Sequence, residues 1–240
     1  MNIRLIAFDL DGTLLNSEKT VSPRTKAALT RAAEHGVVLV PATGRLHRDL
    51  PADVASLPSL RYVIAINGAE VFDLKEDRLL YQAELDRKDA LELMKYMDTL
   101  PAIHGWYQGG QGFISSRYYE RMKDFAHAPW LFDSMRRAYT PTDHPEKTLF
   151  EEESGPQKLQ LYFRDMEARK KALEEIPSRF PQCAVSSSLP INIEVNAMLR
   201  QAGTGVAMGN AAPAAQEAAD RVTGTNDEDG IAAILEEYGF

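Results

Sequence analysis

Short apolar segments alternate with a helix-type pattern over roughly the first 80 residues of the chain. Three runs, Ile3–Phe8, Val37–Val40 and Tyr62–Ile66, are short and apolar, which is typical of strands buried on both faces. Between the first two runs, Ser22-Pro23 predicts a helix start and Gly36 a helix end, because a hydroxyl caps the first turn, proline suits it and glycine ends it. Strands that alternate with helices predict an α/β fold with a doubly wound, Rossmann-like parallel sheet.

The pattern changes after a predicted hairpin of Glu70–Asp73 and Leu79–Gln82. Asp86 is placed to cap a helix, and a glycine-punctuated, aromatic-rich stretch comes after it. Farther along, Lys158–Phe163 alternates polar and apolar residues, as a strand does. We interpret this middle region as a separate unit with an antiparallel sheet.

The end of the chain returns to the pattern of its beginning. Ile191–Val195 and Gly205–Met208 are predicted to be further strands of the first sheet, and Asp229–Tyr238 is predicted to be a closing helix. The order core, insert, core indicates a discontinuous domain. Residues 1–84 and 190–240 are expected to form the core, and residues 85–189 an inserted α+β cap.

Composition and charge narrow the class of protein. Of 240 residues, 44% are hydrophobic and 26% are charged, which excludes collagen-like and disordered chains. The net charge of −8 disfavours nucleic acid and anionic membranes as partners. The single cysteine, Cys183, excludes an internal disulfide and a thiolate-rich zinc site. The apolar runs are too short to span a bilayer and no signal peptide is evident, so we expect a cytoplasmic protein.

The strongest candidate for chemistry is the pair Asp9 and Asp11, which stands in an Asp-x-Asp-Gly-Thr motif after the first predicted strand. Open α/β sheets bind ligands at the carboxyl ends of their strands, and residues two apart in an extended chain point the same way. Such close carboxylates repel unless a cation neutralises them or one is protonated, and hard oxygen ligands favour Mg²⁺. One aspartate would attack phosphorus while the other carries a proton. A solvated acidic turn or a helix cap is the alternative.

A second candidate stands directly after the second predicted strand. The Thr43 hydroxyl and the Gly44 amide are placed to hold phosphate oxygens, although a threonine cap before a glycine turn has the same pattern. Arg45 either helps to hold phosphate or is a surface arginine. Asn67 and Asn210 each end a predicted strand, so each either lines the rim of the same site or forms a tight turn.

Other polar clusters are interpreted as structural. The five histidines have no metal-ligand spacing. The acidic stretch Asn226–Gly230 precedes the closing helix directly, so helix capping is favoured over a metal site. The aromatic residues of the insert are expected to form its core.

Together these motifs resemble those of the haloacid dehalogenase-like hydrolases, specifically the Cof-type phosphatases with a large α/β cap. The resemblance extends over nearly the whole chain. It rests on Phe8-Asp9-Leu10-Asp11-Gly12-Thr13-Leu14-Leu15, Thr43-Gly44-Arg45, Asn67-Gly68-Ala69, Gly205-Val206-Ala207-Met208-Gly209-Asn210-Ala211 and Val222-Thr223-Gly224-Thr225-Asn226-Asp227-Glu228-Asp229-Gly230-Ile231.

The resemblance implies a role for each matching residue. Asp9 would be the nucleophile that forms an aspartyl-phosphate and would bind Mg²⁺. Asp11 would be the general acid and base, at a position that is also metal-binding in the family pattern. Leu10, Thr43 and Gly44 would hold the phosphate.

Two motifs of this family are absent. After Ile191–Ala197 the family continues with a loop lysine, a helix and a strand that ends in acidic residues, whereas here Met198 opens a stretch that resembles the family's segment after those acids. No lysine occurs after Lys171, and Lys158, inside a predicted cap strand, is not a convincing substitute. We therefore predict that a strand–helix unit of about 30 residues is missing between Ala197 and Met198.

Loss of that unit would remove the lysine charge that offsets the phosphate and the acids that complete a Mg²⁺ shell. It would also open the sheet and leave backbone groups unpaired, so the chain is predicted to be poorly stable and inactive. We favour a unit that belongs to the protein but is absent from the sequence over a true deletion that yields a catalytically dead variant. An ordinary peptide link between Ala197 and Met198 inside an intact sheet would contradict this preference.

The function predicted from these motifs is that of a Mg²⁺-dependent phosphomonoesterase. It would act on small phosphorylated metabolites such as sugar phosphates through an aspartyl-phosphate intermediate. A phosphotransferase or mutase uses the same chemistry and is one alternative. A catalytically impaired or non-catalytic phosphate- or metabolite-binding homologue is another, and it agrees with the missing motifs. A phospho-accepting signalling receiver is disfavoured because it has no inserted cap.

Overall fold

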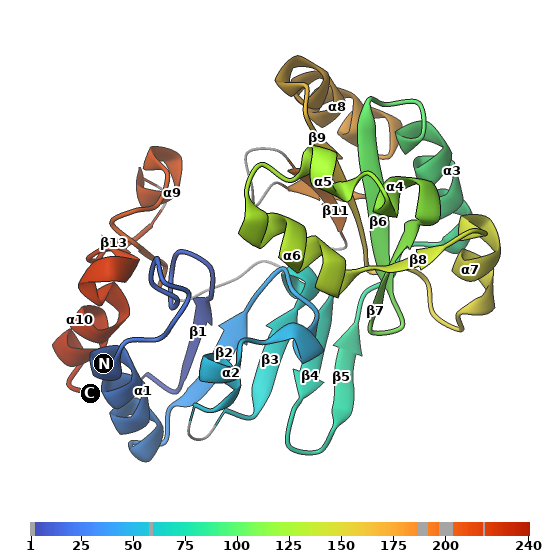
Figure 1. The fold of residues 1–240 in the computed structure, drawn as a ribbon. Helices are drawn as coiled ribbons and strands as arrows, with labels where there is room; N and C mark the ends of the chain where they lie inside the picture. Colours follow the sequence, from blue (N-terminus) through green and yellow to red (C-terminus); the bar gives the residue numbers. More distant parts are fainter. Residues whose placement is uncertain (1–2, 58–59, 187–191, 197–203, 218) are drawn as a thin grey trace.

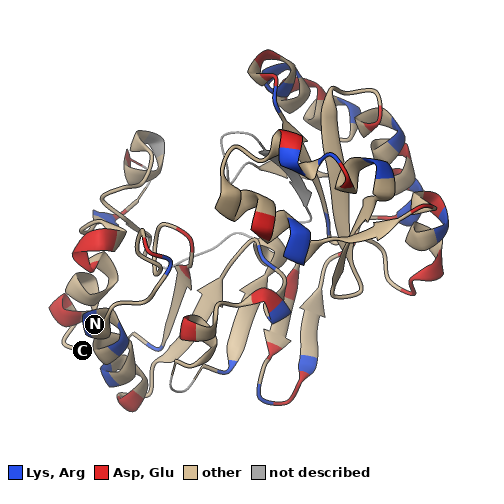
Figure 2. Cartoon of the chain, viewed as in Figure 1, with Lys and Arg blue, Asp and Glu red and all other residues tan. Residues whose placement is uncertain are grey.

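The two larger of the three described β-sheets, called here the core sheet and the cap sheet, lie one above the other in Figure 1. This computed structural model describes residues 3–57, 60–186, 192–196, 204–217 and 219–240. The strands are mostly free of charged side chains, whereas Lys, Arg, Asp and Glu gather on helices and turns (Figure 2). Within the described ranges, no helix is both long enough and apolar enough to cross a membrane.

The core sheet has five strands in the order β1-β2-β3-β4-β5. Neighbours β1, β2 and β3 are parallel, and β4 and β5 return antiparallel as the predicted hairpin. The strands are β1 Leu5–Asp9, β2 Val38–Ala42, β3 Tyr62–Ala65, β4 Glu70–Asp73 and β5 Arg78–Gln82, and the helical segments between them are α1 Pro23–Glu34, η1 His47–Asp49, α2 Ala52–Ala55 and η2 Ile66–Gly68. The predicted α/β class is confirmed.

The first helix, α1, begins and ends where the sequence predicts. The Ser22 hydroxyl accepts a hydrogen bond from the Thr25 N–H at 3.1 Å, and Pro23 occupies the first turn. Gly36 has a φ of +82°, a left-handed conformation that favours glycine after a helix end. Buried Ala28 and Leu29 turn one face of the helix toward β1 and β2.

The first strand differs from its prediction. The apolar run Ile3–Phe8 suggested a strand buried on both faces, but β1 is the edge strand of its sheet, and Leu5 is 56% exposed. The last core strand is separate as well: among the described residues, β12 (Val206–Ala207) pairs only with β13 (Arg221–Val222), in a two-stranded parallel sheet. Among the described residues, no strand hydrogen-bonds to both β1 and β12, so the five-stranded sheet and the two-stranded sheet stay separate.

The chain end nevertheless packs on the core. Met208 beside β12 and Ile231 and Leu235 of the closing helix share a cluster with Phe8 and Leu10. The helices of this region are α9 Pro213–Glu217, η3 Asn226–Glu228 and α10 Gly230–Glu237. The predicted closing helix is therefore confirmed as α10.

The cap sheet has six strands in the order β10-β11-β9-β6-β7-β8, with antiparallel pairs throughout except β7 and β8. Its strands are β6 Ala102–Gln108, β7 Gln111–Ser115, β8 Thr140–Thr142, β9 Lys158–Phe163, β10 Ala184–Ser186 and β11 Asn192–Asn196. Its helices are α3 Arg87–Met97, α4 Ser116–Tyr119, α5 Met122–Phe125, α6 Pro129–Ala138, α7 Pro145–Glu151 and α8 Met166–Arg179.

One predicted core strand belongs to this cap sheet instead. Ile191–Val195 was expected beside the first sheet, but β11 lies between β9 and β10, with Ile193 opposite Leu161. That prediction is wrong because apolar alternation indicates a strand without indicating its partner. We therefore propose that the cap extends to Asn196, beyond the predicted boundary at residue 189.

Each face of the cap sheet has its own apolar cluster. Trp106, 1% exposed, packs with α3, α7 and α8 on one face. On the other face, Ile103 and Tyr162 pack with the α4–α6 segment, and this cluster continues into Val63 and Ile66 of the core. The cap and core thus share one apolar cluster beside the carboxyl ends of β2 and β3.

Candidate active site

Asp9 is the last residue of β1, and the chain turns back sharply after it. The Leu14 N–H donates to the Asp9 carbonyl at 3.1 Å, and the Leu15 N–H donates to the Leu10 carbonyl at 2.8 Å. Gly12 makes this turn with a φ of +82°. Leu10 is fully buried, and its backbone N–H is hydrogen-bonded to the Asp9 carboxylate.

The two aspartates have opposite electrostatic surroundings. Burial raises the pKa of Asp9, and the nearby charge of Asp11 adds to the rise, although the Leu10 N–H and the Thr13 hydroxyl oppose it. For Asp11, burial is outweighed by the hydrogen bonds and charges of Arg45 and Lys19, and its pKa is lowered. The environments thus shift the two pKa values in opposite directions, with that of Asp9 raised and that of Asp11 lowered.

Arg45 connects the first two motifs. Its Nε donates to Asp11 Oδ2 at 3.0 Å, and a terminal nitrogen donates to Asp11 Oδ1 at 3.0 Å. Lys19 Nζ reaches the same Oδ1 at 3.1 Å. This two-pronged contact places the Arg45 guanidinium at the aspartate pair.

Thr43 and Gly44 form a tight loop at the end of β2. The Arg45 N–H donates to Thr43 Oγ1 at 3.2 Å, and the Asn67 N–H donates to the Thr43 carbonyl at 3.0 Å. A Cβ at position 44 would lie only 2.7 Å from Asn67 Oδ1, so a larger residue here would displace the Asn67 side chain. Ile66, a β-branched residue, has a φ of +51°, which is a strained conformation of the kind that gathers at functional sites.

Asn210 and the acidic tail hold the turn after β1. Asn210 Nδ2 donates to the Gly12 carbonyl at 2.8 Å, while its Oδ1 accepts from the Asn226 N–H at 3.0 Å. Asp227 accepts hydrogen bonds from the N–H and hydroxyl of Ser17. The tail thus secures the loop that carries Asp11, and no group of three or more potential metal-ligating side chains occurs in the described part of the chain.

The capping prediction for the tail is confirmed only for Glu228. Its carboxylate accepts from the Thr225 N–H at 3.1 Å and forms a capping box at η3. Asp229 precedes α10 but makes no side-chain cap, and its carboxylate instead accepts from the hydroxyls of Ser22 and Thr25.

Lys158 is a residue whose position the sequence did not reveal. It begins β9 in the cap, as predicted, yet its Nζ donates to the Gly44 carbonyl at 2.8 Å and lies 3.4 Å from Asn67 Oδ1. The side chain is 1% exposed, and the ammonium lies 4.7 Å from the centre of the Tyr107 ring. A cap lysine therefore brings a positive charge directly behind the Thr43–Gly44 loop. The available signal was a lysine at the first position of a predicted strand that alternates polar and apolar residues.

Replacing Lys158 with Met is expected to lower the free energy of unfolding by about 1–3 kcal/mol, because the Gly44 carbonyl loses its buried donor. Urea unfolding measures this change. Lys147→Met, on an exposed face of α7, is the matched control, with an expected change of at most about 0.5 kcal/mol. Equal stability of the two variants would show that the Lys158 contact contributes nothing.

Comparison with known proteins identifies the same family as the motifs. The haloacid dehalogenase-like hydrolase profile matches residues 6–197 and 196–235. The 5-amino-6-(5-phospho-D-ribitylamino)uracil phosphatase of Bacillus subtilis (strain 168) is 27% identical over 244 residues, covering 99% of this chain and 96% of that protein. Another phosphatase of that organism is 27% identical over 288 positions, covering 97% of this chain and 99% of the relative.

Solved structures share the whole fold. A haloacid dehalogenase-like hydrolase from B. subtilis superposes with a TM-score of 0.78 at 24% identity, over 98% of this chain and 99% of its own. A second one, from Bacteroides thetaiotaomicron, has a TM-score of 0.77 at 24% identity, over 99% of this chain and 100% of its own.

The family match also bears on the missing unit. It is split into two segments that meet at residues 196–197, where the sequence predicts the break. One relative aligns over 288 positions, more than the 240 residues of this chain, whereas the first relative aligns over only 244 positions with 99% of this chain, so the missing unit stays a prediction. The link between Ala197 and Met198 lies outside the described residues. Among the described residues, β1 and β12 lie in separate sheets.

A profile match over most of the chain, full-length phosphatase relatives and a shared fold all agree with the residues gathered at the end of β1. The chain belongs to the haloacid dehalogenase-like hydrolases, and within them it is a phosphatase of the Cof type.

Proposed function

We propose that this phosphatase is a Mg²⁺-dependent phosphomonoesterase that acts on small phosphorylated metabolites, such as sugar phosphates, through an aspartyl-phosphate. The observation that carries the proposal is the pairing of Asp9 and Asp11 at the end of β1, with Arg45 from the loop after β2 bonded to Asp11. Two carboxylates beside a guanidinium supply a nucleophile, a proton carrier and a positive charge for phosphoryl transfer.

In the first step, an Asp9 carboxylate oxygen attacks phosphorus and the bond to the leaving oxygen breaks. The Asp11 carboxyl donates its proton to that oxygen, and the alcohol departs. In the second step, Asp11 takes a proton from water as the water oxygen attacks the aspartyl-phosphate. The products are inorganic phosphate and a regenerated Asp9 carboxylate, so atoms and charge balance over the cycle.

We propose three groups that bind the phosphate oxygens. We assign the Leu10 N–H, the Thr43 hydroxyl and the Gly44 N–H to this role, with Lys158 adding positive charge behind the loop. Arg45, now bonded to Asp11, gains a second anionic partner when phosphate binds. Its transfer to phosphate would free Asp11 and raise the pKa of this carboxyl toward that of a working acid.

The aspartate pair fits Mg²⁺ in its chemistry. Mg²⁺ binds oxygen ligands and takes one or two carboxylates together with water and substrate phosphate oxygens. Asp9 and Asp11 would hold the ion, and the burial that raises the pKa of Asp9 makes a nearby cation favourable. When bound, the ion would neutralise part of the negative charge of the phosphate.

The relatives support the substrate class. The B. subtilis relative is named for a phosphorylated ribitylamino-uracil, and a Shigella flexneri relative that is 35% identical over 113 residues is named HMP-PP phosphatase. We propose that this chain also acts on small phosphorylated metabolites. The cap would select the leaving group and exclude water. Nucleic acid and membranes are not proposed as partners, and a cytoplasmic location is expected.

A non-catalytic phosphate-binding homologue is the second candidate. Arg45 and Lys19 already neutralise Asp11, and the described residues include no third carboxylate beside the pair. Calorimetry that detects phosphorylated-metabolite binding in the absence of turnover would favour this alternative.

Metal removal tests the proposed function directly. Hydrolysis of p-nitrophenyl phosphate is expected to fall to the buffer rate in excess EDTA and to return with Mg²⁺, because the carboxylate pair repels phosphate without a cation. Equal rates with and without EDTA would contradict the Mg²⁺ requirement. A screen of phosphorylated metabolites, read as released phosphate, then identifies the substrate.

A further inference from the structure

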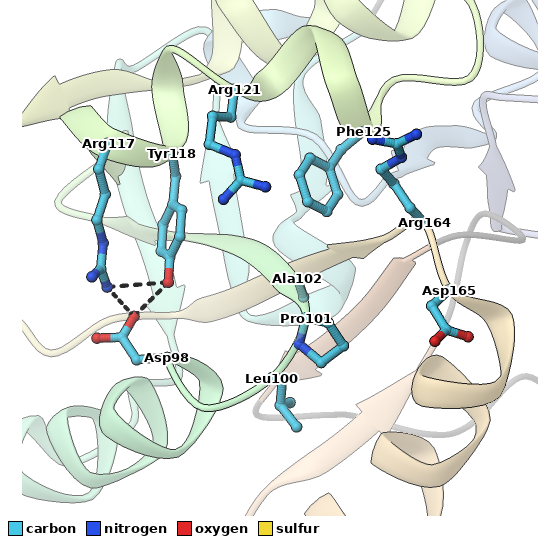
Figure 3. A pocket seen from close by; sticks show the side chains of 10 residues that line it. All are labelled: Asp98, Leu100, Pro101, Ala102, Arg117, Tyr118, Arg121, Phe125, Arg164 and Asp165. Atoms are coloured by element: carbon cyan, nitrogen blue, oxygen red, sulfur yellow. Dashed lines mark hydrogen bonds and ion pairs between the residues drawn. The ribbon is translucent and has the colours of Figure 1, made fainter.

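A second group of arginines lines a cavity on the cap, well away from Asp9. The cavity has a volume of about 490 Å³ and lies between the α4–α5 segment, the start of β6 and the end of β9 (Figure 3). Its lining consists of three arginines, two aspartates and apolar or aromatic groups: Arg117, Arg121, Arg164, Asp98, Asp165, Leu100, Pro101, Ala102, Tyr118 and Phe125.

This cavity is distinct from the candidate active site. Strand β9 begins at Lys158, whose Nζ contacts Gly44 of the core, and ends at Phe163, directly before Arg164. A strand advances about 3.3 Å per residue, so the backbone of Arg164 lies roughly 20 Å from that of Lys158. A single phosphate cannot contact Arg164 and the Gly44 loop together.

Both acidic side chains of the cavity already have donors. The Asp98 carboxylate accepts from His104 at 2.8 Å, from Tyr118 at 2.8 Å and from Arg117 at 2.5 Å. Asp165 caps α8 and accepts from the N–H groups of residues 167 and 168. The negative charges of the cavity are therefore compensated within the cap.

Two of the three arginines remain available to a ligand. Arg121 and Arg164 form no ion pair with a carboxylate among the described residues, and both are exposed. The Arg121 guanidinium lies 5.4 Å from the centre of the Phe125 ring, and Figure 3 shows it reaching into the cavity between Tyr118 and Phe125, with Arg164 on the other side of Phe125. Positive charge therefore enters the cavity from both sides of one aromatic ring.

The chemistry of this lining matches a phosphorylated small molecule. Guanidinium groups bind phosphate oxygens in a two-pronged geometry, which makes arginine the preferred residue for such groups. The cavity volume exceeds that of one phosphate and falls in the range of small-molecule sites. Phe125, Leu100 and Ala102 offer apolar surface to an organic portion.

We propose that this cap cavity binds the phosphate group of a small metabolite through Arg121 and Arg164. The site is separate from the catalytic centre, and the proposal does not depend on turnover at Asp9. A ligand here would occupy the end of the cap sheet opposite to the end that touches the core.

Arginine-specific labelling with phenylglyoxal, combined with peptide mass spectrometry, tests the site with inorganic phosphate as the probe. Labelling of Arg121 and Arg164 is expected to be roughly threefold slower in about 10 mM phosphate than in chloride at equal ionic strength. This is the protection expected when phosphate binds with a dissociation constant of a few millimolar. Arg45 reports phosphate binding at the core site in the same experiment. Protection of Arg45 alone, or of none of the three, would overturn the proposal.

Substitutions give a second, independent measurement. Arg121→Gln combined with Arg164→Gln is expected to remove one of two phosphate-binding events in calorimetry and to leave Arg45 protection intact. Arg136→Gln, an exposed arginine over the Tyr119 ring outside the cavity, is the matched control and should change neither. Thermal unfolding verifies that the variants are folded. Unchanged calorimetry in the folded double variant would contradict the site.

Discussion

Inserting a strand–helix unit between Ala197 and Met198 is expected to stabilise the protein and to raise its phosphatase activity. The unit is taken from the matching stretch of the B. subtilis relative that aligns over 288 positions. It would place a strand between β1 and β12, which now lie in separate sheets.

The expected gain in stability comes from apolar side chains that such a strand and helix would cover. Leu5 is 56% exposed, Val206 38% and Val222 52%. Complete burial of a side chain of this size contributes about 1.5–3 kcal/mol, so a gain of several kcal/mol in the free energy of unfolding is expected. Urea unfolding at 25 °C measures it.

The expected gain in activity comes from charge. The unit would bring the family's loop lysine and acidic residues to the aspartate pair, where they would neutralise phosphate and complete a Mg²⁺ shell. Hydrolysis of p-nitrophenyl phosphate is therefore expected to rise by about 10²-fold or more. A Gly/Ser linker of equal length is the control, and an equal effect of this linker would refute the missing-strand interpretation.

Replacing Asp9 with Asn is expected to reduce phosphatase activity by about 10³-fold or more, because an amide cannot form the covalent intermediate. Asp9 stands at the end of β1 and its Oδ2 accepts from the Thr13 hydroxyl at 3.1 Å, a contact that the amide oxygen of Asn preserves. The fold should therefore remain intact. The rate is measured as released phosphate, and Asp9→Asn is made in whichever form of the chain, with or without the inserted unit, is more active.

A matched control separates the loss of a nucleophile from the loss of a charge. Asp77→Asn changes an exposed turn residue between β4 and β5 whose φ is +48°, a conformation that Asn tolerates. This variant should retain the parent rate. Trapping the phosphorylated chain with labelled substrate provides a second readout, and a label that persists in Asp9→Asn would exclude Asp9 as the nucleophile.

Local signals predicted local structure well. The helix α1 was predictable from its cap at Ser22 and its stop at Gly36, since both act within a few residues. Likewise the motif at Asp9 and Asp11 was predictable from a strand and its carboxyl end, where two side chains two residues apart must converge. The same reasoning failed for β11, because a strand pattern does not specify a partner.

Contacts between distant residues required the folded chain. The Arg45–Asp11 pair joins two loops 34 positions apart, and the Lys158–Gly44 contact joins the cap and core across 114 positions. No periodicity or spacing encodes such distances, because they arise only when sheets form and pack. The arginines of the cap cavity come together for the same reason, from segments that precede and follow β9.

By itself, the sequence determined the α/β class, the family and the closeness of the two aspartates, since each depends on residues adjacent in the chain. The tertiary structure alone decided that β1 is an edge strand, that β11 belongs to the cap and that a cap lysine supports the Gly44 loop. These properties depend on which strands pair and which surfaces pack, and those are interactions between segments far apart in the chain.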